Sequence, residues 1–187
     1  MKEKLREHIE RLVSLTDDEF ADVFSHFKID TFKKQDFLFH KGARVNYAYF
    51  VASGLLMLVH NDESGKQHIV SFAMEDWWET DFLAFYTQTK ATMSLQCLED
   101  TTVFCILLED YQELCARLPK MNHFFLVKSN FGHIGSQQRI LSFLTSNAKE
   151  RYEQLLQRYP SLIQRVPKTL LASYLGVSRE TLSRLYA

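Results

Sequence analysis

Hydrophobic residues follow a helical spacing at the start of the chain. Phe20, Phe24 and Phe27 recur at intervals of three and four, which places their side chains on one face of a helix. Thr16 and Glu19 precede this run in the Thr-x-x-Glu arrangement of a capping box, in which each side chain bonds the backbone N–H of the other residue. The pattern predicts that the first 28 residues are helical.

The pattern changes to that of β-strands between residues 29 and 108. Short runs rich in β-branched and aromatic residues alternate with turn signals, among them Gly42, Gly54 and Gly65. The predicted strands cover residues 37–40, 47–51, 55–60, 67–72, 95–98 and 102–107, and residues 61–66 form a hairpin loop. Many short strands at this spacing indicate an antiparallel sandwich or jelly-roll barrel.

A helix returns at Glu109, and a long one is predicted from Pro119 to Leu144. Along the long helix, apolar residues alternate steps of three and four, as at the a and d positions of a coiled coil. The residues of this seam are Phe124, Val127, Phe131, Ile134, Gln138 and Leu141. The seam predicts pairing with the same helix of a second copy; the alternative is a helix packed on its own sheet.

The segment from Lys168 to Leu185 has the pattern of two short helices joined by a sharp turn. Ala172 is small enough for the helices to cross closely, and Gly176 supplies the left-handed backbone that the turn requires. Ser178 is a suitable N-cap for the second helix. The residues predicted to bury the inner face are Leu171, Leu175, Val177, Leu182 and Leu185.

The outer face of this helix pair carries groups that suit DNA. Arg bonds bidentately to guanine and Glu accepts from cytosine in the major groove, and Arg179 and Glu180 begin the second helix, whose N-terminal end reaches base edges in a helix-turn-helix. The candidate DNA-binding residues are Lys168, Thr169, Ser178, Arg179, Glu180, Ser183 and Arg184. Lys168 and Thr169 are placed for phosphate contacts. The alternative is an ordinary helical hairpin with a solvated charged face.

The distribution of charge along the chain supports a DNA-binding role for its C-terminal part. The whole sequence carries −1. Residues 137–187 contain eight Lys and Arg against three acids, a net +5, whereas the remainder has 14 bases and 20 acids, a net −6. The positive charge that attracts a polyanion is therefore concentrated at one end of the chain.

Residues 177–184, Val-Ser-Arg-Glu-Thr-Leu-Ser-Arg, closely resemble the recognition-helix motif of the Crp/Fnr family, the bacterial regulators related to the cyclic-AMP receptor protein. The resemblance implies that Arg179, Glu180 and Arg184 read bases. More loosely, it extends over nearly the whole chain: the three turn glycines match those of a cyclic-nucleotide-binding β-roll, and the long helix matches the dimerisation helix.

Two departures from the family pattern concern its effectors. Nucleotide-binding members hold the phosphate with a Gly-Glu-Leu-like helix start and a later Arg. Residues 75–94 lack both, Lys90 is the only base among them, and Glu75, Glu79 and Asp81 would repel an anion. Binding of cyclic AMP in the family's usual manner is therefore not expected. The chain also lacks an N-terminal cysteine cluster for an iron–sulfur centre, and it resembles a Bacteroidetes-type subset with a degenerate cassette.

Aromatic residues crowd the same stretch and offer a candidate effector pocket. Its predicted lining is Trp77, Trp78, Phe82, Phe85 and Lys90. Core packing is the first explanation of such a patch, and a pocket for an apolar or aromatic effector is the second.

The remaining chemistry does not suggest an enzyme. The three cysteines form no Cys-x-x-Cys pair, and we expect them to be buried small hydrophobes. His40, His60 and His68 lack the His-x-His pairing of a cupin-like metal site. We expect no catalytic residue, metal or cofactor. The charged start is unlike a signal peptide and no run has the length of a membrane span, so a cytoplasmic protein is expected.

Together these features predict an α+β protein with N-terminal helices, an antiparallel β-roll or jelly roll, a long dimerisation helix and a C-terminal helix-turn-helix. The expected boundaries are 1–118 for the sensor domain, 119–144 for the dimerisation helix and 145–187 for the DNA-binding domain. We expect a homodimeric transcription regulator on a palindromic DNA site, answering to an unknown small-molecule effector or to none, with RNA polymerase as a further candidate partner. The alternative is a ligand-sensing module that signals through a protein partner.

Overall fold

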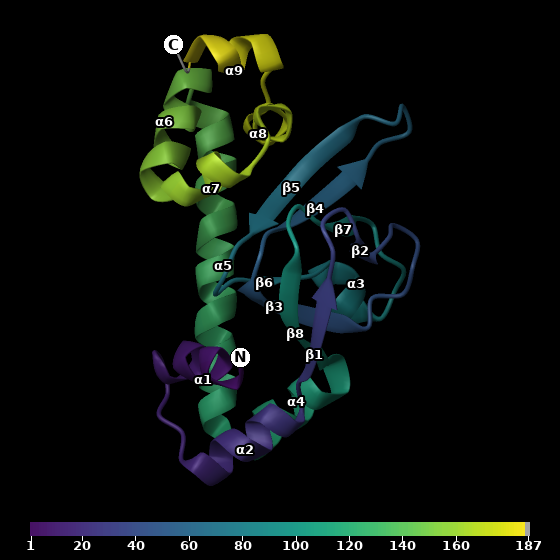
Figure 1. Ribbon diagram of the computed structural model, residues 1–187, viewed down its shortest axis with the longest axis vertical. Helices are drawn as coiled ribbons and strands as arrows, with labels where there is room; N and C mark the ends of the chain where they lie inside the picture. The colour runs from purple at the N-terminus through teal and green to yellow at the C-terminus, as the bar shows by residue number, and fades with distance from the viewer. Residues whose placement is uncertain (186–187) are drawn as a thin grey trace.

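A computed structural model describes residues 1–185 and shows an α+β fold, which confirms the predicted class (Figure 1). The helices of this part of the chain are α1 (Lys2–Glu10), α2 (Asp17–Ser25), α3 (Phe82–Thr87), α4 (Leu108–Arg117), α5 (Pro119–Thr145), α6 (Ala148–Arg158), α7 (Pro160–Arg165), α8 (Lys168–Leu175) and α9 (Arg179–Leu185). Helix α5 runs along the molecule, with α1 and α2 near one end and α6 to α9 at the other (Figure 1). No helix within residues 1–185 combines the length and apolarity needed to cross a membrane.

Two four-stranded antiparallel sheets form the sandwich. The strands are β1 (Lys28–Phe32), β2 (Phe37–Phe39), β3 (Tyr47–Ser53), β4 (Leu56–Asn61), β5 (Gln67–Ala73), β6 (Trp78–Glu79), β7 (Ser94–Cys97) and β8 (Thr101–Leu107). One sheet has the order β1-β8-β3-β6 and the other β2-β7-β4-β5. Sequence reasoning missed β1, none of whose residues is fully buried, and β6, which has only two residues.

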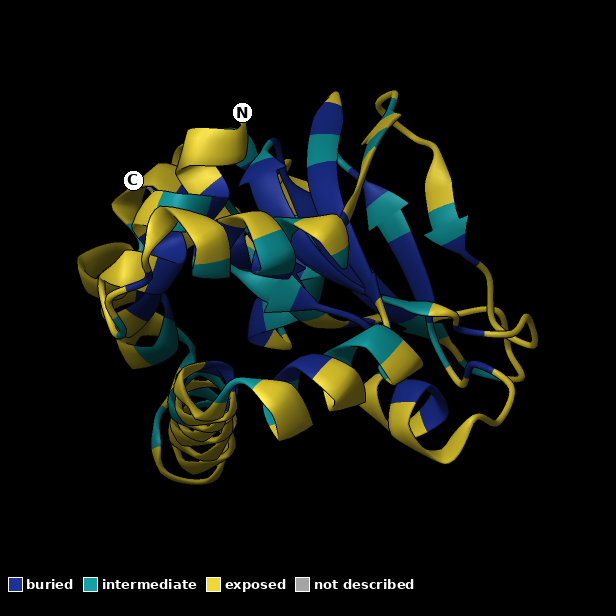
Figure 2. Cartoon of the chain, turned by 90° about the horizontal axis from the view of Figure 1, so that it is seen from below, coloured by how far each residue is buried: buried dark blue, intermediate teal, exposed yellow. Residues whose placement is uncertain are grey.

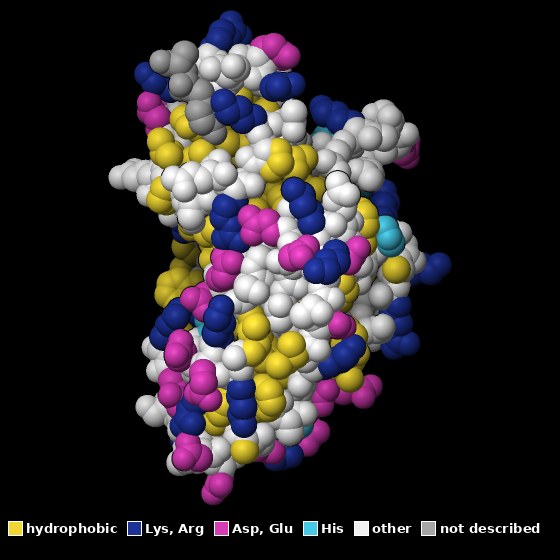
Figure 3. Space-filling view, in the orientation of Figure 1, with side chains coloured by type: hydrophobic (Ala, Val, Ile, Leu, Met, Phe, Trp, Pro, Cys, Tyr) yellow, Lys and Arg dark blue, Asp and Glu magenta, His cyan; other side chains and the backbone are white. Residues whose placement is uncertain are grey.

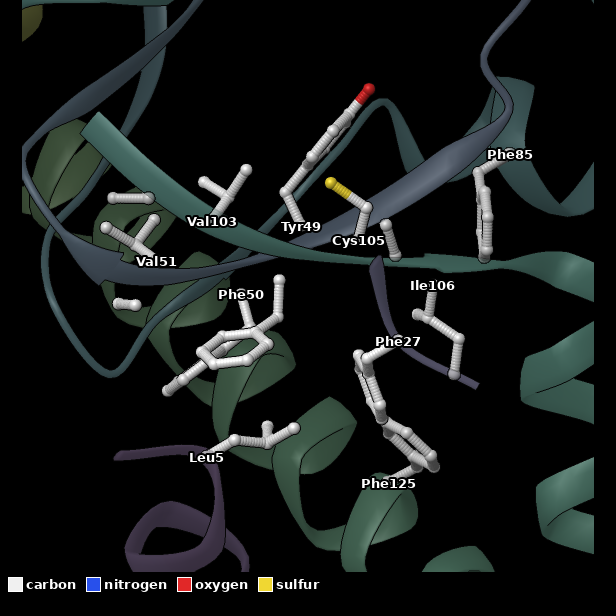
Figure 4. Close-up of a cluster of buried hydrophobic side chains, with 14 of the residues drawn as sticks. Leu5, Phe27, Tyr49, Phe50, Val51, Phe85, Val103, Cys105, Ile106 and Phe125 are labelled. Atoms are coloured by element: carbon white, nitrogen blue, oxygen red, sulfur yellow. The ribbon is translucent and has the colours of Figure 1, made fainter. Parts of the chain in front are cut away.

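The main core lies on both faces of the sheet that contains β3 and β8. Tyr49 and Cys105 point into the sandwich, whereas Phe50 and Ile106 point toward the helices, where they meet side chains such as Phe125 of α5 (Figure 4). Successive residues of a strand face opposite ways, so a strand buried on both faces reads as a continuous apolar run. The N-terminal helices are therefore part of the same core as the β-sandwich.

Local signals fix several element ends as predicted. In the capping box of α2, the Glu19 N–H donates to Thr16 Oγ1 at 3.2 Å and the Thr16 N–H donates to Glu19 Oε2 at 2.8 Å. A second capping box, Asn147 with Glu150, starts α6 and was not anticipated. The turn glycines at 42, 54 and 65 all have positive φ. At Gly54 a Cβ would also lie 2.7 Å from the Asp100 carbonyl oxygen, so only glycine fits there.

A second core joins the C-terminal helices to the sensor. It combines apolar side chains on or beside β4 and β5 with the inner side chains of α6 to α9. Its sheet members are Leu55, Met57, Val59, Ile69 and Phe72, and its helix members include Leu162, Val166, Leu171, Leu175 and Leu182. The outer face of this sheet is thus covered by the C-terminal unit of the same chain, whereas much of α5 stays exposed on the side turned away from the sandwich (Figure 2).

Candidate nucleic-acid interface

The turn between α8 and α9 has the geometry of a helix-turn-helix. Gly176 ends α8 in the left-handed conformation, with φ 68° and ψ 36°. The N–H of Val177 then bonds the Ala172 carbonyl at 3.0 Å, which closes the helix end in a Schellman-like turn. A Cβ at position 176 would lie 2.9 Å from Cε1 of Phe143 on α5, so glycine also permits a close approach between the turn and the long helix.

Helix α9 begins with the cap that the sequence predicted. The Thr181 N–H donates to Ser178 Oγ at 3.1 Å. Leu171, Leu175 and Leu182 are buried, as predicted for the inner face, and Val177 is half-buried. Ala172, predicted as the small residue at the helix crossing, is buried as well. The side chain of Leu185, also predicted there, lies outside the described residues.

The predicted base-reading side chains project from the molecule. Arg179, Glu180, Ser183 and Arg184 are all exposed on α9, at the end of the molecule farthest from α1 and α2 (Figure 1). Hydrogen bonds from its own backbone N–H and from the Ser178 hydroxyl hold the pKa of Glu180 below its usual value, so it is ionised at neutral pH. Lys and Arg side chains gather around this end, with a few acids among them, and acids are more frequent at the opposite end (Figure 3). Lys168, Thr169 and Ser178 are exposed beside this face.

Two arginines fix the end of α8 against its neighbours. Arg139 of α5 donates from Nη2 to the carbonyls of Tyr174, at 3.2 Å, and Ile69, at 3.0 Å. Arg151 of α6 donates from Nε to the Leu175 carbonyl at 3.0 Å. Cations at a helix C-terminus satisfy carbonyls that have no partner within the helix. The turn before α9 is therefore held by side chains from two other helices.

A third arginine joins the C-terminal unit to the sensor. Arg165, at the end of α7, donates to Glu75 at 2.7 and 3.0 Å, to Glu99 at 2.6 and 2.9 Å, and to the Gly54 carbonyl at 2.9 Å. These hydrogen bonds to carboxylates raise the pKa of Arg165 above its usual value. Glu75 also accepts the Gly54 N–H at 2.8 Å. We call this group the Arg165 clamp; no local pattern marks it, because its partners come from three separate loops.

The three arginines correct the electrostatic argument made from the sequence. Arg139, Arg151 and Arg165 account for three of the eight basic residues in the +5 segment, and all three are engaged with carbonyls or carboxylates of this chain. The positive charge open to a polyanion is therefore smaller than the count suggests. Arg179 and Arg184, on the outer face of α9, remain exposed.

The predicted seam on α5 is only partly available to a second copy. Phe124 is fully buried in its own chain, where its ring packs edge-on against His8, so its assignment to the seam is corrected. It faces inward because the first turns of α5 cover the sensor's helices. Beyond them, Phe131, Ile134 and Leu141 are 63%, 46% and 50% exposed. Gln138 is exposed and Val127 is half-buried on the same stretch.

The stretch equivalent to a phosphate cassette is filled by the chain's own carboxylates. Glu79 is buried; it accepts the hydroxyl proton of Ser71 and the backbone N–H that follows it. Asp81, also buried, caps α3 by accepting the Ala84 N–H at 3.2 Å, and it accepts the N–H and hydroxyl of Thr92 at 2.7 and 2.8 Å. Backbone N–H groups that could approach an anion are thus already occupied by carboxylate oxygens.

Burial of these acids has an electrostatic consequence. Loss of hydration, together with the nearby Asp81, raises the pKa of the Glu79 carboxyl to about 7, against the lowering effect of the hydrogen bonds from Ser71 and the Thr80 N–H. An incoming phosphate would meet the buried carboxyl groups of Glu79 and Asp81. The geometry agrees with the expectation of a degenerate cassette.

The structure does not bring the predicted effector-pocket residues together. Trp77 packs against Tyr159 of the C-terminal unit, and Trp78 packs against aromatic rings of the main core and donates to His8 Nε2 at 3.2 Å. The remaining members also diverge: Phe85 is buried, while Phe82 and Lys90 are exposed. Core packing explains the two tryptophans and Phe85, so the predicted pocket is corrected. Among residues 1–185, no group of three or more His, Cys, Asp and Glu side chains is arranged to hold a metal ion.

Comparison with known proteins first defines the class of the β-sandwich domain. The family described as "Cyclic nucleotide-binding domain" matches residues 29–118, which contain all of the strands except the first residue of β1. The chain is 26% identical over 165 residues to the transcriptional activator protein Anr of Pseudomonas protegens, covering 82% of this chain and 67% of that protein. It is 27% identical over 167 residues to the anaerobic regulatory protein of Haemophilus influenzae, covering 82% and 63%.

A solved structure agrees over the same range. FixK2 from Bradyrhizobium japonicum superimposes with a TM-score of 0.75 at 14% identity, covering 86% of this chain and 82% of that one. The chain is thus similar to regulators of the Crp/Fnr type over most of its length, and residues 29–118 match the cyclic nucleotide-binding family. It spans about two thirds of the length of the curated relatives, both of which are named as regulators. Its place in a Bacteroidetes-type subset stays a prediction.

Proposed function

We propose that this protein is a Crp/Fnr-type transcription regulator that binds duplex DNA sequence-specifically. The observation that carries the proposal is the division of α9 into two faces. Leu182 is buried on the inner face, whereas Arg179, Glu180 and Arg184 are exposed on the outer face. A recognition helix requires this division, because its outer side chains must enter the major groove while its inner ones hold it to the first helix.

The proposal includes a homodimer formed through α5. Phe131, Ile134 and Leu141 expose large apolar side chains on a helix that has no cover on that side within residues 1–185 (Figure 2). Exposed apolar patches of this kind mark interaction sites. A two-fold dimer would present two recognition helices to half-sites about 34 Å apart, and hence to a palindrome. Contact with RNA polymerase stays a prediction of the family resemblance.

The sensor's part in the proposal differs from phosphate recognition. Because Glu79 and Asp81 fill the cassette, we do not propose a cyclic nucleotide as the effector. The second core and the Arg165 clamp join the sensor to the DNA-binding unit, so a change in the sensor can reach α9 through direct contacts. Regulation of this kind shifts the balance between two orientations of the unit.

The test measures binding to labelled duplex DNA over a range of salt concentrations. We expect affinity to fall steeply with salt in the natural protein, and to be lost in the Arg179→Ala/Arg184→Ala double variant. The matched control is Lys149→Ala/Arg158→Ala, which removes the same charge from exposed positions of the same unit outside α9. Equal loss in both double variants would indicate non-specific attraction, and no DNA binding at all would favour a protein partner; either result contradicts the proposal.

A further inference from the structure

Arg139 is a half-buried cation, and within residues 1–185 it has no carboxylate partner. Its guanidinium lies 3.6 Å from the centre of the Tyr174 ring, and both of its hydrogen bonds are made by Nη2 to backbone carbonyls. Nη1 is buried and has no hydrogen-bond partner. Within residues 1–185 no carboxylate lies within ion-pair distance of it. Burying an ionised group without an opposite charge is unfavourable, and arginine does not escape by losing its proton.

A groove opens beside this side chain. It has a volume of about 350 Å³ and lies between β5 and the C-terminal half of α5. Its lining is Val70, Ser136, Arg139, Ile140, Phe143 and Leu144. Four of these side chains are apolar and one is a hydroxyl, so Arg139 supplies the only charge of the lining. The volume lies within the range of small-molecule sites.

We propose that this groove binds a small organic anion, a carboxylate on an apolar body, whose charge pairs with Arg139. The apolar body would lie against Val70, Ile140 and Leu144, which are 41%, 59% and 78% exposed. An anion is favoured over a neutral ligand because it supplies the missing counter-charge, and charge-assisted hydrogen bonds to a guanidinium are the strong ones. The site is distinct from the cassette, where Glu79 and Asp81 present carboxyl groups of the chain itself.

Its position gives the anion a route to the DNA-binding unit. Arg139 Nη2 bridges the Ile69 carbonyl of the sensor and the Tyr174 carbonyl of α8. A carboxylate competes for the same guanidinium protons, so occupancy changes the bond that fixes α8 to the long helix. This last step rests on the proposed DNA-binding function, whereas binding of the anion does not.

The experiment titrates the full-length protein with octanoate and with 1-naphthoate by calorimetry, using octan-1-ol as the neutral probe of similar length. We expect saturable binding of at least one of the two carboxylates at one per chain, and at least tenfold weaker binding of the alcohol. Arg139→Gln should weaken carboxylate binding at least tenfold and leave the alcohol unchanged. Val70→Trp, which fills the groove and keeps Arg139, should abolish both. Arg158→Gln, which changes an exposed arginine of α6 outside the groove, should have no effect.

Each contrary result overturns the proposal. Equal affinity for the carboxylate and the alcohol would show an apolar groove only. No saturable binding of either carboxylate would show no site. Binding confined to a monomeric Leu141→Asp variant would show that a second copy covers the groove. DNA affinity is measured in parallel: saturable carboxylate binding without any DNA binding would refute the proposed function and leave the site standing.

Discussion

At the scale of single residues, the buried acid Glu79 makes the stability of the sensor depend on pH. Burial raises the pKa of its carboxyl from 4.5 in the unfolded chain to about 7 in the fold. Between these values the folded protein holds a proton that the unfolded chain has lost, so the free energy of unfolding falls as the pH rises through this window. Burial lowers the pKa of His8 to about 4, which gives the opposite slope below its ordinary value of 6.5.

Glu79→Gln should remove the part of the pH dependence of stability that comes from the acid, and it should leave the part that comes from His8. The amide oxygen can accept the Thr80 N–H, and the amide N–H can donate to the Ser71 oxygen in place of the hydrogen bond that the Ser71 hydroxyl donates to Glu79. Between pH 4.5 and pH 8, we expect the free energy of unfolding of the variant to rise by about 3 kcal/mol relative to that of the natural protein, because of the shift in the pKa of Glu79. Chemical denaturation of both proteins at each pH measures the difference, in which His8 cancels. If the difference between the two free energies of unfolding stayed constant across this pH range, the raised pKa of the buried Glu79 carboxyl would be contradicted.

Residues whose structural role depends on neighbours in sequence were the ones that could be predicted. Thr16 with Glu19, Gly176 and Ser178 act over a few residues, and the structure confirms each. Arg165 could not be assigned, because its partners Glu75 and Glu99 are 90 and 66 residues away. For the same reason, the sequence counted Arg165 as charge available for DNA.

At the scale of elements, the Arg165 clamp fixes α7 to three loops of the sensor. Arg165→Ala should lower the free energy of unfolding by about 2 kcal/mol, the value of hydrogen bonds to charged groups. The loss is smaller than for a fully buried pair because the side chains of Glu75 and Glu99 are 40% and 35% exposed. We also expect faster proteolysis of the C-terminal helices than of the sandwich. The control, Arg158→Ala, removes a guanidinium that pairs with no carboxylate in the described part of the chain. Equal stability of both variants would argue against the clamp.

Elements with long or regular patterns were predicted well, and short ones were not. Periodicity over many residues located the long helix, which the structure places at Pro119–Thr145. The same periodicity could not separate an inward from an outward position, so Phe124 was assigned to the seam although it is buried in its own chain. The aromatic residues around Trp78 were ambiguous for a similar reason, since core and pocket have the same composition.

At the scale of the whole molecule, the exposed face of α5 should hold two copies together. Ile134→Asp/Leu141→Asp places charges in the middle of that face, and we expect it to convert a dimer to a monomer in sedimentation velocity. Leu83→Asp is the matched control, because Leu83 is 60% exposed on α3 and lies outside the face. DNA affinity should fall when dimerisation is lost, since each separate protomer would then bind only one half-site. A natural protein that sediments as a monomer at micromolar concentration would contradict this part of the account.

The central claim is that α9 reads DNA sequence in a two-fold arrangement, and selection from a random duplex library tests it most directly. The account predicts an enriched palindrome whose half-sites are centred about 34 Å apart, roughly one helical turn. Arg179→Ala and Glu180→Ala should each relax the preference at one position per half-site, at about 1–3 kcal/mol, without changing the spacing. Enrichment of no sequence, or of a single asymmetric site that is insensitive to both substitutions, would contradict the account.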